Sequence, residues 1–311
     1  MLGIDPQFIA FGLIVGILVG LTGIGGGSLM APLLLLAGGV PPSIAVGTDL
    51  AYGAVTKTVG GWRHLRAGTV DMGISKWLAF GSVPGALVGV FASVQLENAY
   101  GDSYNSILLS LVAAALMLVS FAILYRVWFM PHLSEVERHE VDLTPRIKAS
   151  AVSFGLVMGA ILGLTSVGSG ALIGLALILF FRLKPHRVVG TDVFHAAILM
   201  WTAAIAHAFA DNIDYGLAAT LLIGSIPGVL IGTWLLPYVP ANGLRPALAC
   251  VLLAASLGVA TKAGADVPPW LIVALPVTAG VIAWVFHRRR VAAESREAAT
   301  VAVPTTKPRT A

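Results

Sequence analysis

The sequence has 311 residues, of which 57% are hydrophobic and only 11% are charged. Soluble proteins carry about 25% charged residues, so this composition, with a mean hydropathy of +0.89, excludes an ordinary soluble domain and predicts an all-α polytopic membrane protein. The formal net charge of +4 does not indicate nucleic-acid binding, because the basic residues fall in short loops and in the C-terminal tail.

The first apolar segment covers about residues 7–39 and is interrupted at 23–28 by a cluster of glycines. Glycine has a low helix propensity and adopts positive φ freely, so the cluster is expected to break the helix. A break at membrane depth is tolerated only where the freed backbone groups face protein or a wet cavity. We therefore predict a re-entrant or hairpin helix pair whose turn lies inside the bilayer.

The later apolar segments each have about the 20 residues that cross about 30 Å of hydrocarbon. They are separated by short turns and by one longer hydrophilic stretch at 130–148. The segment at 149–182 is interrupted at 166–170, in the same manner as the first one. The expected segments are 43–63, 74–94, 106–129, 149–182, 187–209, 215–237, 243–262 and 269–287.

The sequence contains an internal repeat at an offset of 143 residues, which needs no gap. Apolar composition alone does not keep Gly, Pro, Asp and His in phase over such a length, so the pattern indicates a duplication. We expect one transmembrane domain over 1–290 and a disordered cytoplasmic tail at 291–311. Repeat one covers about 7–129, repeat two covers about 149–262, and an extra helix covers 269–287. The matching stretches are Gly20–Leu29 with Gly163–Leu172, Val46–Asp49 with Val189–Asp192, and Gly81–Gly85 with Gly224–Gly228.

The distribution of basic residues predicts the orientation in the membrane. If the interrupted segments are hairpins, 17 of the 19 Lys and Arg residues fall on one face. We expect the chain to lie in the inner membrane of the cell. The positive-inside rule then places the N-terminus outside and the C-terminus in the cytoplasm. Equivalent loops of the two halves carry opposite charge character, which predicts inverted repeats. The alternative, with parallel repeats, puts basic loops on both faces.

The two glycine breaks predict an anion site near the midplane. Each break frees helix N-terminal N–H groups and the positive end of a helix dipole, which together favour an anion. In the alternative interpretation the glycines only permit close helix packing and the hydroxyls bond back to the backbone. The candidate substrate-binding residues are Thr22, Gly25, Gly26, Gly27, Ser28, Thr165, Ser166, Gly168, Ser169 and Gly170.

Ionisable residues inside the apolar segments are candidates for coupling or gating, because such groups are rare in a bilayer and usually functional. Asp49 and Asp192 either cap the glycine turns or take up a proton, since burial favours the neutral carboxylic acid. Lys57 either snorkels to the interface or balances a bound anion. Tyr52 and His195 lie one helical turn beyond the two aspartates, on the same faces.

These residues resemble the TauE/SafE sulfite exporter family over about 7–287. The resemblance rests on Gly23–Gly27 with Pro32, on the two Gly-Thr-Asp copies and on the duplicated four-segment plan. It implies outward transport of sulfite or a small organosulfonate across a bacterial cytoplasmic membrane. The second copy departs from the pattern, because Ser166 and Ser169 replace glycines and Leu175 replaces the proline.

The preferred hypothesis is a secondary transporter for a small sulfur oxyanion, coupled to protons. No Walker motif is present, so ATP is not expected to supply the energy directly. A passive anion channel, an intramembrane aspartyl protease and a transporter of metal cations are the alternatives. The mirrored depths of the two aspartates disfavour the protease, and the converging helix N-termini disfavour the metal transporter. We expect no enzyme activity, cofactor or metal. The expected partners are a small anion and the lipid bilayer, not nucleic acid, and the sequence leaves a homodimer open.

Overall fold

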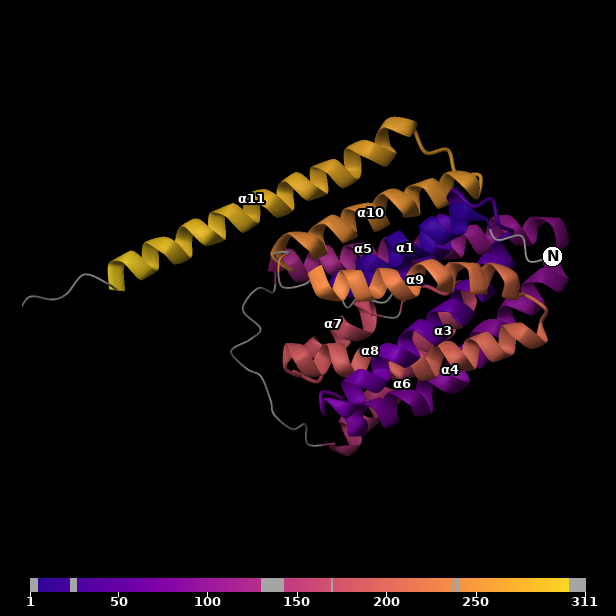
Figure 1. Ribbon diagram of the computed structural model, residues 1–311, viewed down its shortest axis with the longest axis horizontal. Helices are drawn as coiled ribbons and strands as arrows, with labels where there is room; N and C mark the ends of the chain where they lie inside the picture. Colours follow the sequence, from indigo (N-terminus) through magenta and orange to yellow (C-terminus); the bar gives the residue numbers. More distant parts are fainter. Residues whose placement is uncertain are drawn as a thin grey trace, which may run out of the picture.

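The computed structural model describes residues 5–22, 27–129, 143–168, 170–235, 238 and 241–301. All regular structure in these ranges is helical, apart from one isolated bridge residue, and most helices run roughly along a common direction (Figure 1). The helices are α1 (Pro6–Thr22), α2 (Gly27–Leu36), α3 (Pro42–Arg66), α4 (Met72–Tyr100), the short 3-10 helix η1 (Gly101–Ser103), α5 (Tyr104–Phe129), α6 (Pro145–Thr165), α7 (Ala171–Leu179), α8 (Pro185–Phe209), α9 (Tyr215–Leu235), α10 (Ala241–Lys262) and α11 (Pro269–Val301).

These helices confirm the predicted all-α architecture, and each expected apolar segment corresponds to one helix or one broken pair. The prediction of a disordered tail at 291–311 is wrong in part, because α11 continues to Val301 and projects beyond the other helices (Figure 1). Residues 291–301 include four alanines, two glutamates and one arginine, which are strong helix formers, so polarity alone did not indicate disorder here. The rest of the predicted tail, at 302–311, lies outside the described residues.

Both broken helices double back on themselves. The side-chain amide of Gln7, at the start of α1, donates to the carbonyl of Ala37 just beyond α2, at 3.2 Å. In the second half the rings of Phe154 in α6 and Phe180 after α7 lie 6.4 Å apart. The ends of each pair therefore return toward the side from which the pair began.

The equivalent helices α3 and α8 form an antiparallel pair at the centre of the fold. A Cβ atom added to Gly53 would lie 2.8 Å from the sulfur of Met200, and one added to Gly60 would lie 3.1 Å from Val193. Contacts that advance along α3 thus move backward along α8. The indole N–H of Trp201 also donates to the hydroxyl of Thr58 at 2.8 Å, which joins the pair on its outer side.

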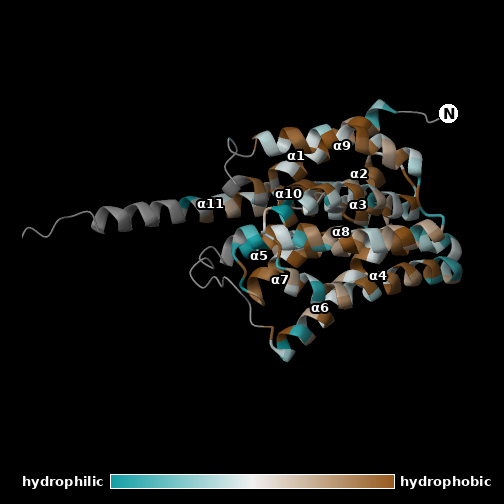
Figure 2. Ribbon diagram, turned by 60° about the horizontal axis from the view of Figure 1, so that its bottom comes forward, coloured by the Kyte–Doolittle hydropathy of each residue, from teal (hydrophilic) through white to brown (hydrophobic). Residues whose placement is uncertain are grey.

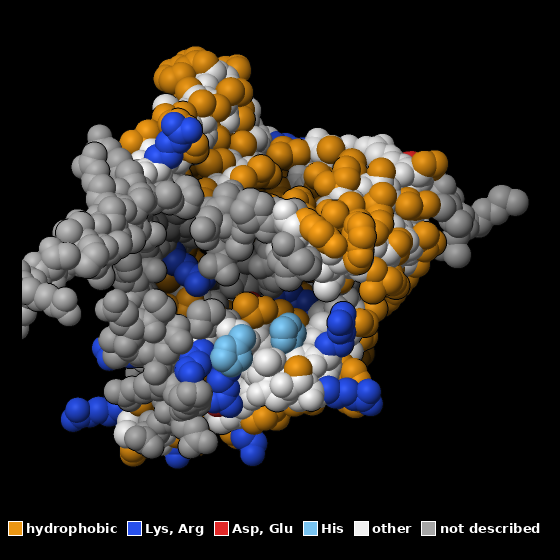
Figure 3. Space-filling model, turned by 60° about the vertical axis from the view of Figure 1, so that its left-hand side comes forward, with side chains coloured by type: hydrophobic (Ala, Val, Ile, Leu, Met, Phe, Trp, Pro, Cys, Tyr) orange, Lys and Arg blue, Asp and Glu red, His pale blue; other side chains and the backbone are white. Residues whose placement is uncertain are grey.

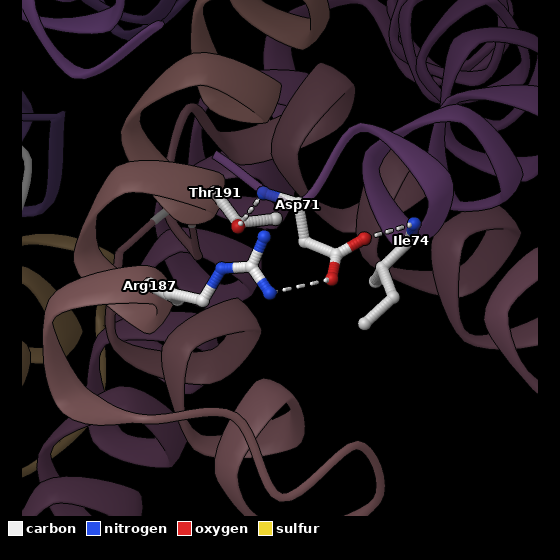
Figure 4. A network of polar contacts seen from close by, with 4 residues as sticks. All are labelled: Asp71, Ile74, Arg187 and Thr191. Atoms are coloured by element: carbon white, nitrogen blue, oxygen red, sulfur yellow. Dashed lines mark hydrogen bonds and ion pairs between the residues drawn. The ribbon is translucent and has the colours of Figure 1, made fainter. Parts of the chain in front are cut away.

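Two threonines tie each half to the other. The Thr191 hydroxyl accepts the backbone N–H of Asp71 at 2.8 Å, and the Thr48 hydroxyl accepts that of Asp214 at 3.0 Å. These pairs are related by the repeat offset. Each aspartate also caps the helix that follows it, α4 or α9, by accepting a backbone N–H. Figure 4 shows the network around Asp71, to which Arg187 adds an ion pair at 3.7 Å.

Four helices pack through rows of glycines spaced four residues apart. The row on α1 meets the row on α9, and the row on α6 meets the row on α4, so both contacts join the two halves. Small residues at this spacing let helix backbones approach closely, as is common between membrane helices. The rows are Gly12, Gly16 and Gly20 with Gly224, Gly228 and Gly232, and Gly155, Gly159 and Gly163 with Gly81, Gly85 and Gly89.

The exterior is apolar enough for a membrane. Figure 2 shows hydrophilic residues mainly toward the ends of the helices. Among the described residues α3 falls outside the candidate spans, since it carries Asp49, Lys57 and three basic residues in its last turn. Five stretches are long and apolar enough to cross a bilayer: Met72–Arg126, Pro145–Thr165, His186–Phe209, Tyr215–Leu235 and Pro269–Phe286.

The glycine contacts predict a steric limit at Gly81. A Cβ atom there would lie 1.9 Å from the carbonyl oxygen of Val152, and backbone atoms cannot move aside cheaply. We expect Gly81→Ala to destabilise the protein by about 1–3 kcal/mol, the usual cost of overpacking. Thermal unfolding in detergent measures the effect. The matched control is Gly174→Ala in α7, where the nearest atom is Val188 Cγ1 at 3.8 Å; an equal loss in both variants would contradict the contact.

Candidate functional site

The break between α6 and α7 exposes the N-terminus of α7 inside the protein. Ser166 ends α6 with a left-handed φ of 61°, and Gly168 and Gly170 have φ of 124° and 99°. The last two values strain any residue with a side chain, which explains the glycines. Gly170 is the N-cap of α7, so the half-helix starts directly after this glycine.

A carboxylate already lies at this helix N-terminus. Asp192, on α8, accepts a hydrogen bond from the backbone N–H of Gly170. Its other oxygen, Oδ1, has no hydrogen-bond partner among the described residues, although the side chain is only 3% exposed. Asp192 thus satisfies a backbone N–H group of the break. It also shows that the N-terminus of α7 can hold an oxyanion.

Asp49 holds the equivalent place on α3 but has a different partner. Its Oδ2 accepts a hydrogen bond from the hydroxyl of Ser166, which belongs to the other half. Its Oδ1 makes no hydrogen bond within the described ranges, and the side chain is completely buried. The serine that departs from the glycine pattern of the first copy is therefore the residue that binds Asp49.

Lys57 is the buried cation between the two aspartates. The side chain is 4% exposed, and its ammonium finds no hydrogen-bond partner in the described part of the chain. Its strongest electrostatic attraction is to Asp192, followed by Asp49. No nitrogen–oxygen distance within 4.0 Å joins it to either carboxylate. The ammonium is enclosed inside the protein, so Lys57 does not snorkel to the interface.

The two aspartates lie at different levels of the α3–α8 pair. Val193, the neighbour of Asp192, packs on Gly60. Gly60 is 11 positions beyond Asp49 in the chain, or about 16 Å along the helix at 1.5 Å per residue. Such a separation does not allow the two carboxylates to share a proton, so the geometry gives no support to an aspartyl protease.

Tyr52 and His195 make equivalent contacts that link the central pair to its flanking helices. The Tyr52 hydroxyl donates to the hydroxyl of Ser225 on α9 at 2.9 Å, and Nε2 of His195 lies 3.1 Å from the hydroxyl of Ser82 on α4. Sequence reasoning did not select either serine. The repeat offset could have found them, because it relates Tyr52 to His195 and Ser82 to Ser225.

The remaining candidates divide into four groups. Ser28, in the first turn of α2, is buried, and its hydroxyl lacks a hydrogen-bond partner in the described ranges. The Thr165 hydroxyl donates to the carbonyl of Ile161 at 2.6 Å, so it bonds back to its own helix. Gly27 is the first residue of α2, and Thr22 is the last residue of α1. Gly25, Gly26 and Ser169 lie outside the described residues.

The buried side chains of this cluster are closed off from both ends of the molecule. Asp49, Lys57 and Asp192 are between 0% and 4% exposed. Two surface cavities, one between α3 and α8 and one beside α7, have almost wholly apolar linings that include none of the three residues. Neither of these two cavities therefore reaches the three charged side chains.

Comparison with known proteins identifies the family of this chain. The description "Sulfite exporter TauE/SafE" matches residues 8–259, which include both halves. The chain belongs to the TauE/SafE family. Curated relatives are named as membrane transporters. "Probable membrane transporter protein YjnA" of Bacillus subtilis is 40% identical over 81% of this chain and 98% of its own length.

Two further relatives carry similar names at greater distance. "Probable membrane transporter protein YdhB" of Bacillus subtilis is 29% identical over 77% of this chain and 96% of its own length. A "Probable membrane transporter protein" of Xylella fastidiosa strain 9a5c is 31% identical over 73% and 83%. No solved structure matches the chain significantly. As a TauE/SafE protein, the chain is a multi-pass membrane transporter of the sulfite exporter family.

The contact between Asp49 and Ser166 predicts a stability effect. Ser166→Ala leaves the buried carboxyl of Asp49 without its hydrogen-bond donor, and such a loss costs about 1–3 kcal/mol. Thermal unfolding in detergent should show the decrease. The control is Ser110→Ala, because Ser110 is exposed and its hydroxyl only donates to a carbonyl of its own helix. A Ser166→Ala variant as stable as the control would show that the contact contributes nothing.

Proposed function

We propose that the chain exports a small sulfur oxyanion, sulfite or an organosulfonate, across the cytoplasmic membrane by proton-coupled secondary transport. One observation carries the proposal: the N-terminus of a broken helix inside the protein already binds the carboxylate of Asp192. The backbone N–H groups and the helix dipole that favour this carboxylate favour any compact oxyanion. The family assignment supports the class of substrate.

The surrounding charges explain why protons would be coupled to the anion. The cluster contains two aspartates, Asp49 and Asp192, and one lysine, Lys57, so its net charge is negative when all three are ionised. At about 6 Å and an effective dielectric near 20, an anion and one carboxylate repel by roughly 3 kcal/mol. At about 1.4 kcal/mol per factor of ten, this repulsion slows passage roughly a hundredfold. Protonation of the carboxylate as the anion arrives removes the repulsion.

The basic residues support the proposed orientation and the inverted relation of the halves. Lys and Arg side chains gather around the end of the molecule toward which α11 runs (Figure 3). The start of α8 contacts the connection between α3 and α4, and Lys148 of α6 lies over Trp77 of α4. These basic helix ends therefore share one face, which by the positive-inside rule is cytoplasmic.

The alternative functions require different properties of the cluster formed by Asp49, Lys57 and Asp192. A metal-cation transporter needs several ligating side chains together, and the described residues hold no group of three or more His, Cys, Asp or Glu that could bind a metal. A passive anion channel needs no titrating group, so it separates from a coupled transporter by whether a proton gradient drives uphill flux.

Reconstitution in proteoliposomes tests the proposed transport. With a panel of anions we expect flux of sulfite or a small sulfonate that an imposed proton gradient accelerates. Gly170→Val should reduce it at least tenfold, because a β-branched residue cannot keep the φ of 99° that presents the α7 N-terminus. Gly174→Ala in the same half-helix is the control. Normal flux in the valine variant would exclude the α7 N-terminus as the binding site.

The orientation is tested by cysteine labelling in intact cells. After Cys250 is replaced by alanine, a single cysteine is introduced at position 140, between α5 and α6. We expect a membrane-impermeant maleimide to label it only after the cells are opened, because this loop is cytoplasmic in the proposed topology. Labelling from outside intact cells would reverse the orientation.

The coupling is tested by Asp49→Asn and Asp192→Asn. Parent protein should bind the anion more tightly as the pH falls, because protonation removes the competing negative charge. Each variant should keep anion binding but lose part or all of this pH dependence. Anion-induced thermal stabilisation from about pH 5.5 to about pH 8.5 measures the effect. If both aspartates only cap helices, asparagine caps equally well and both variants should behave like the parent.

A further inference from the structure

We propose that the Lys57 ammonium and the Gly170 N–H form one oxyanion site, which the Asp192 carboxylate and a transported monovalent oxyanion occupy in turn. The inference rests on the proposed function and deepens it, since it names the cation that binds the substrate. It also predicts that the substrate is a monoanion, such as a sulfonate or hydrogensulfite, and not a dianion.

Lys57 is the observation that carries this assignment. A buried ammonium normally has hydrogen-bond acceptors around it, because an unsatisfied buried charge is costly. Lys57 is 4% exposed, has no hydrogen-bond acceptor within the described ranges, and contacts neither aspartate within 4.0 Å. The cation is thus held in place inside the protein with its donor capacity unused.

Asp192 connects the two donors. One of its oxygens takes the N–H of Gly170, and its charge gives Lys57 the strongest attraction that the lysine has. The other oxygen has no hydrogen-bond partner in the described part of the chain. A group with three oxygens, such as a sulfonate, could accept from the helix N-terminus with one oxygen and from the ammonium with another, which the planar carboxylate does not do here.

The charge balance favours a monovalent ligand. When Asp192 takes up a proton and an oxyanion of charge −1 replaces its carboxylate, the site keeps the same net charge around Lys57. A dianion would add one uncompensated negative charge to a closed, apolar interior. Met200 holds the place of Lys57 in the second half and is buried. The two halves therefore supply one cation, not two.

Among the residues that the structure describes, few other titratable groups face this site. Asp49 and Lys57 come from α3, and Asp192 and His195 come from α8. The half-helices α2 and α7 contain no ionisable side chain. The flanking helices α4 and α9 present the hydroxyls of Ser82 and Ser225 to His195 and Tyr52. A pH-dependent change in anion binding should therefore arise from the two aspartates or from His195.

The test uses methanesulfonate, which stays a monoanion over the whole range tested, so that any pH dependence belongs to the protein. Its binding is measured by thermal stabilisation of the purified full chain at about pH 6 and about pH 8. We expect the parent to bind more weakly at the higher pH. Asp192→Asn should remove most of that difference and bind at least about tenfold more tightly than the parent at the higher pH, because the competing carboxylate is gone.

Lys57→Met introduces the residue found at the equivalent place in the other half, and it should abolish stabilisation by methanesulfonate. Removal of one charge can unfold a protein, so the double variant Lys57→Met/Asp192→Asn removes both charges together. We expect it to fold and not to bind. Lys76→Met is the matched control, since Lys76 is exposed on α4, and it should bind as the parent does.

Two results would overturn the site. One is a double variant that binds methanesulfonate as tightly as Asp192→Asn, which would show that Lys57 is not a ligand. The other is an Asp192→Asn variant no tighter than the parent at the higher pH, a result that does not depend on the folding of any lysine variant. If the parent neither binds nor transports sulfite or any sulfonate, the proposed function itself fails, and this site fails with it. Sulfate bound as tightly as methanesulfonate would overturn the preference for a monoanion.

Discussion

The close approach of helix backbones is the constraint on which this structure depends. Glycine rows bring α1 onto α9 and α4 onto α6 so tightly that a methyl group at Gly81 or Gly224 would overlap a carbonyl oxygen of the facing helix. Hydrocarbon gives helices no hydrophobic reason to associate, so close packing and hydrogen bonds have to hold them. Because both glycine contacts join the first half to the second, neither half can complete its packing alone.

This packing fixes the frame in which the broken helices can exist. A backbone reversal inside a bilayer leaves N–H groups without partners unless protein surrounds them. Here α2 and α7 lie against the central pair α3–α8, and Asp49 and Asp192 of that pair both bind residues of the break between α6 and α7. These contacts hold two carboxylates inside the protein, near the buried ammonium of Lys57. In the proposed mechanism, the residues that bind the broken helix also act in anion transport.

Much of this could be predicted from the sequence, and the reasons lie in particular residues. The repeat offset of 143 residues predicts both breaks and pairs Asp49 with Asp192. The contact of Asp49 with Ser166 could not be predicted, because it crosses between the halves and requires the angle of the chain at residue 166. Ser82 and Ser225 were not selected, although the repeat offset relates them to each other as it relates Tyr52 to His195. Polarity suggested a disordered tail where helix propensity extended α11 instead.

The reciprocal ties also have a consequence for how such a protein can vary. Thr48 with Asp214 and Thr191 with Asp71 are the same contact made twice, as it would be between two identical subunits of opposite orientation. Identical subunits can only place charges in their shared interior in even numbers. A chain whose two halves differ in sequence can place an odd number of charges there. Lys57, whose repeat partner is the buried Met200, is a single charge of this kind, so the sequence difference between the halves gives a nearly symmetric scaffold an electrically asymmetric interior.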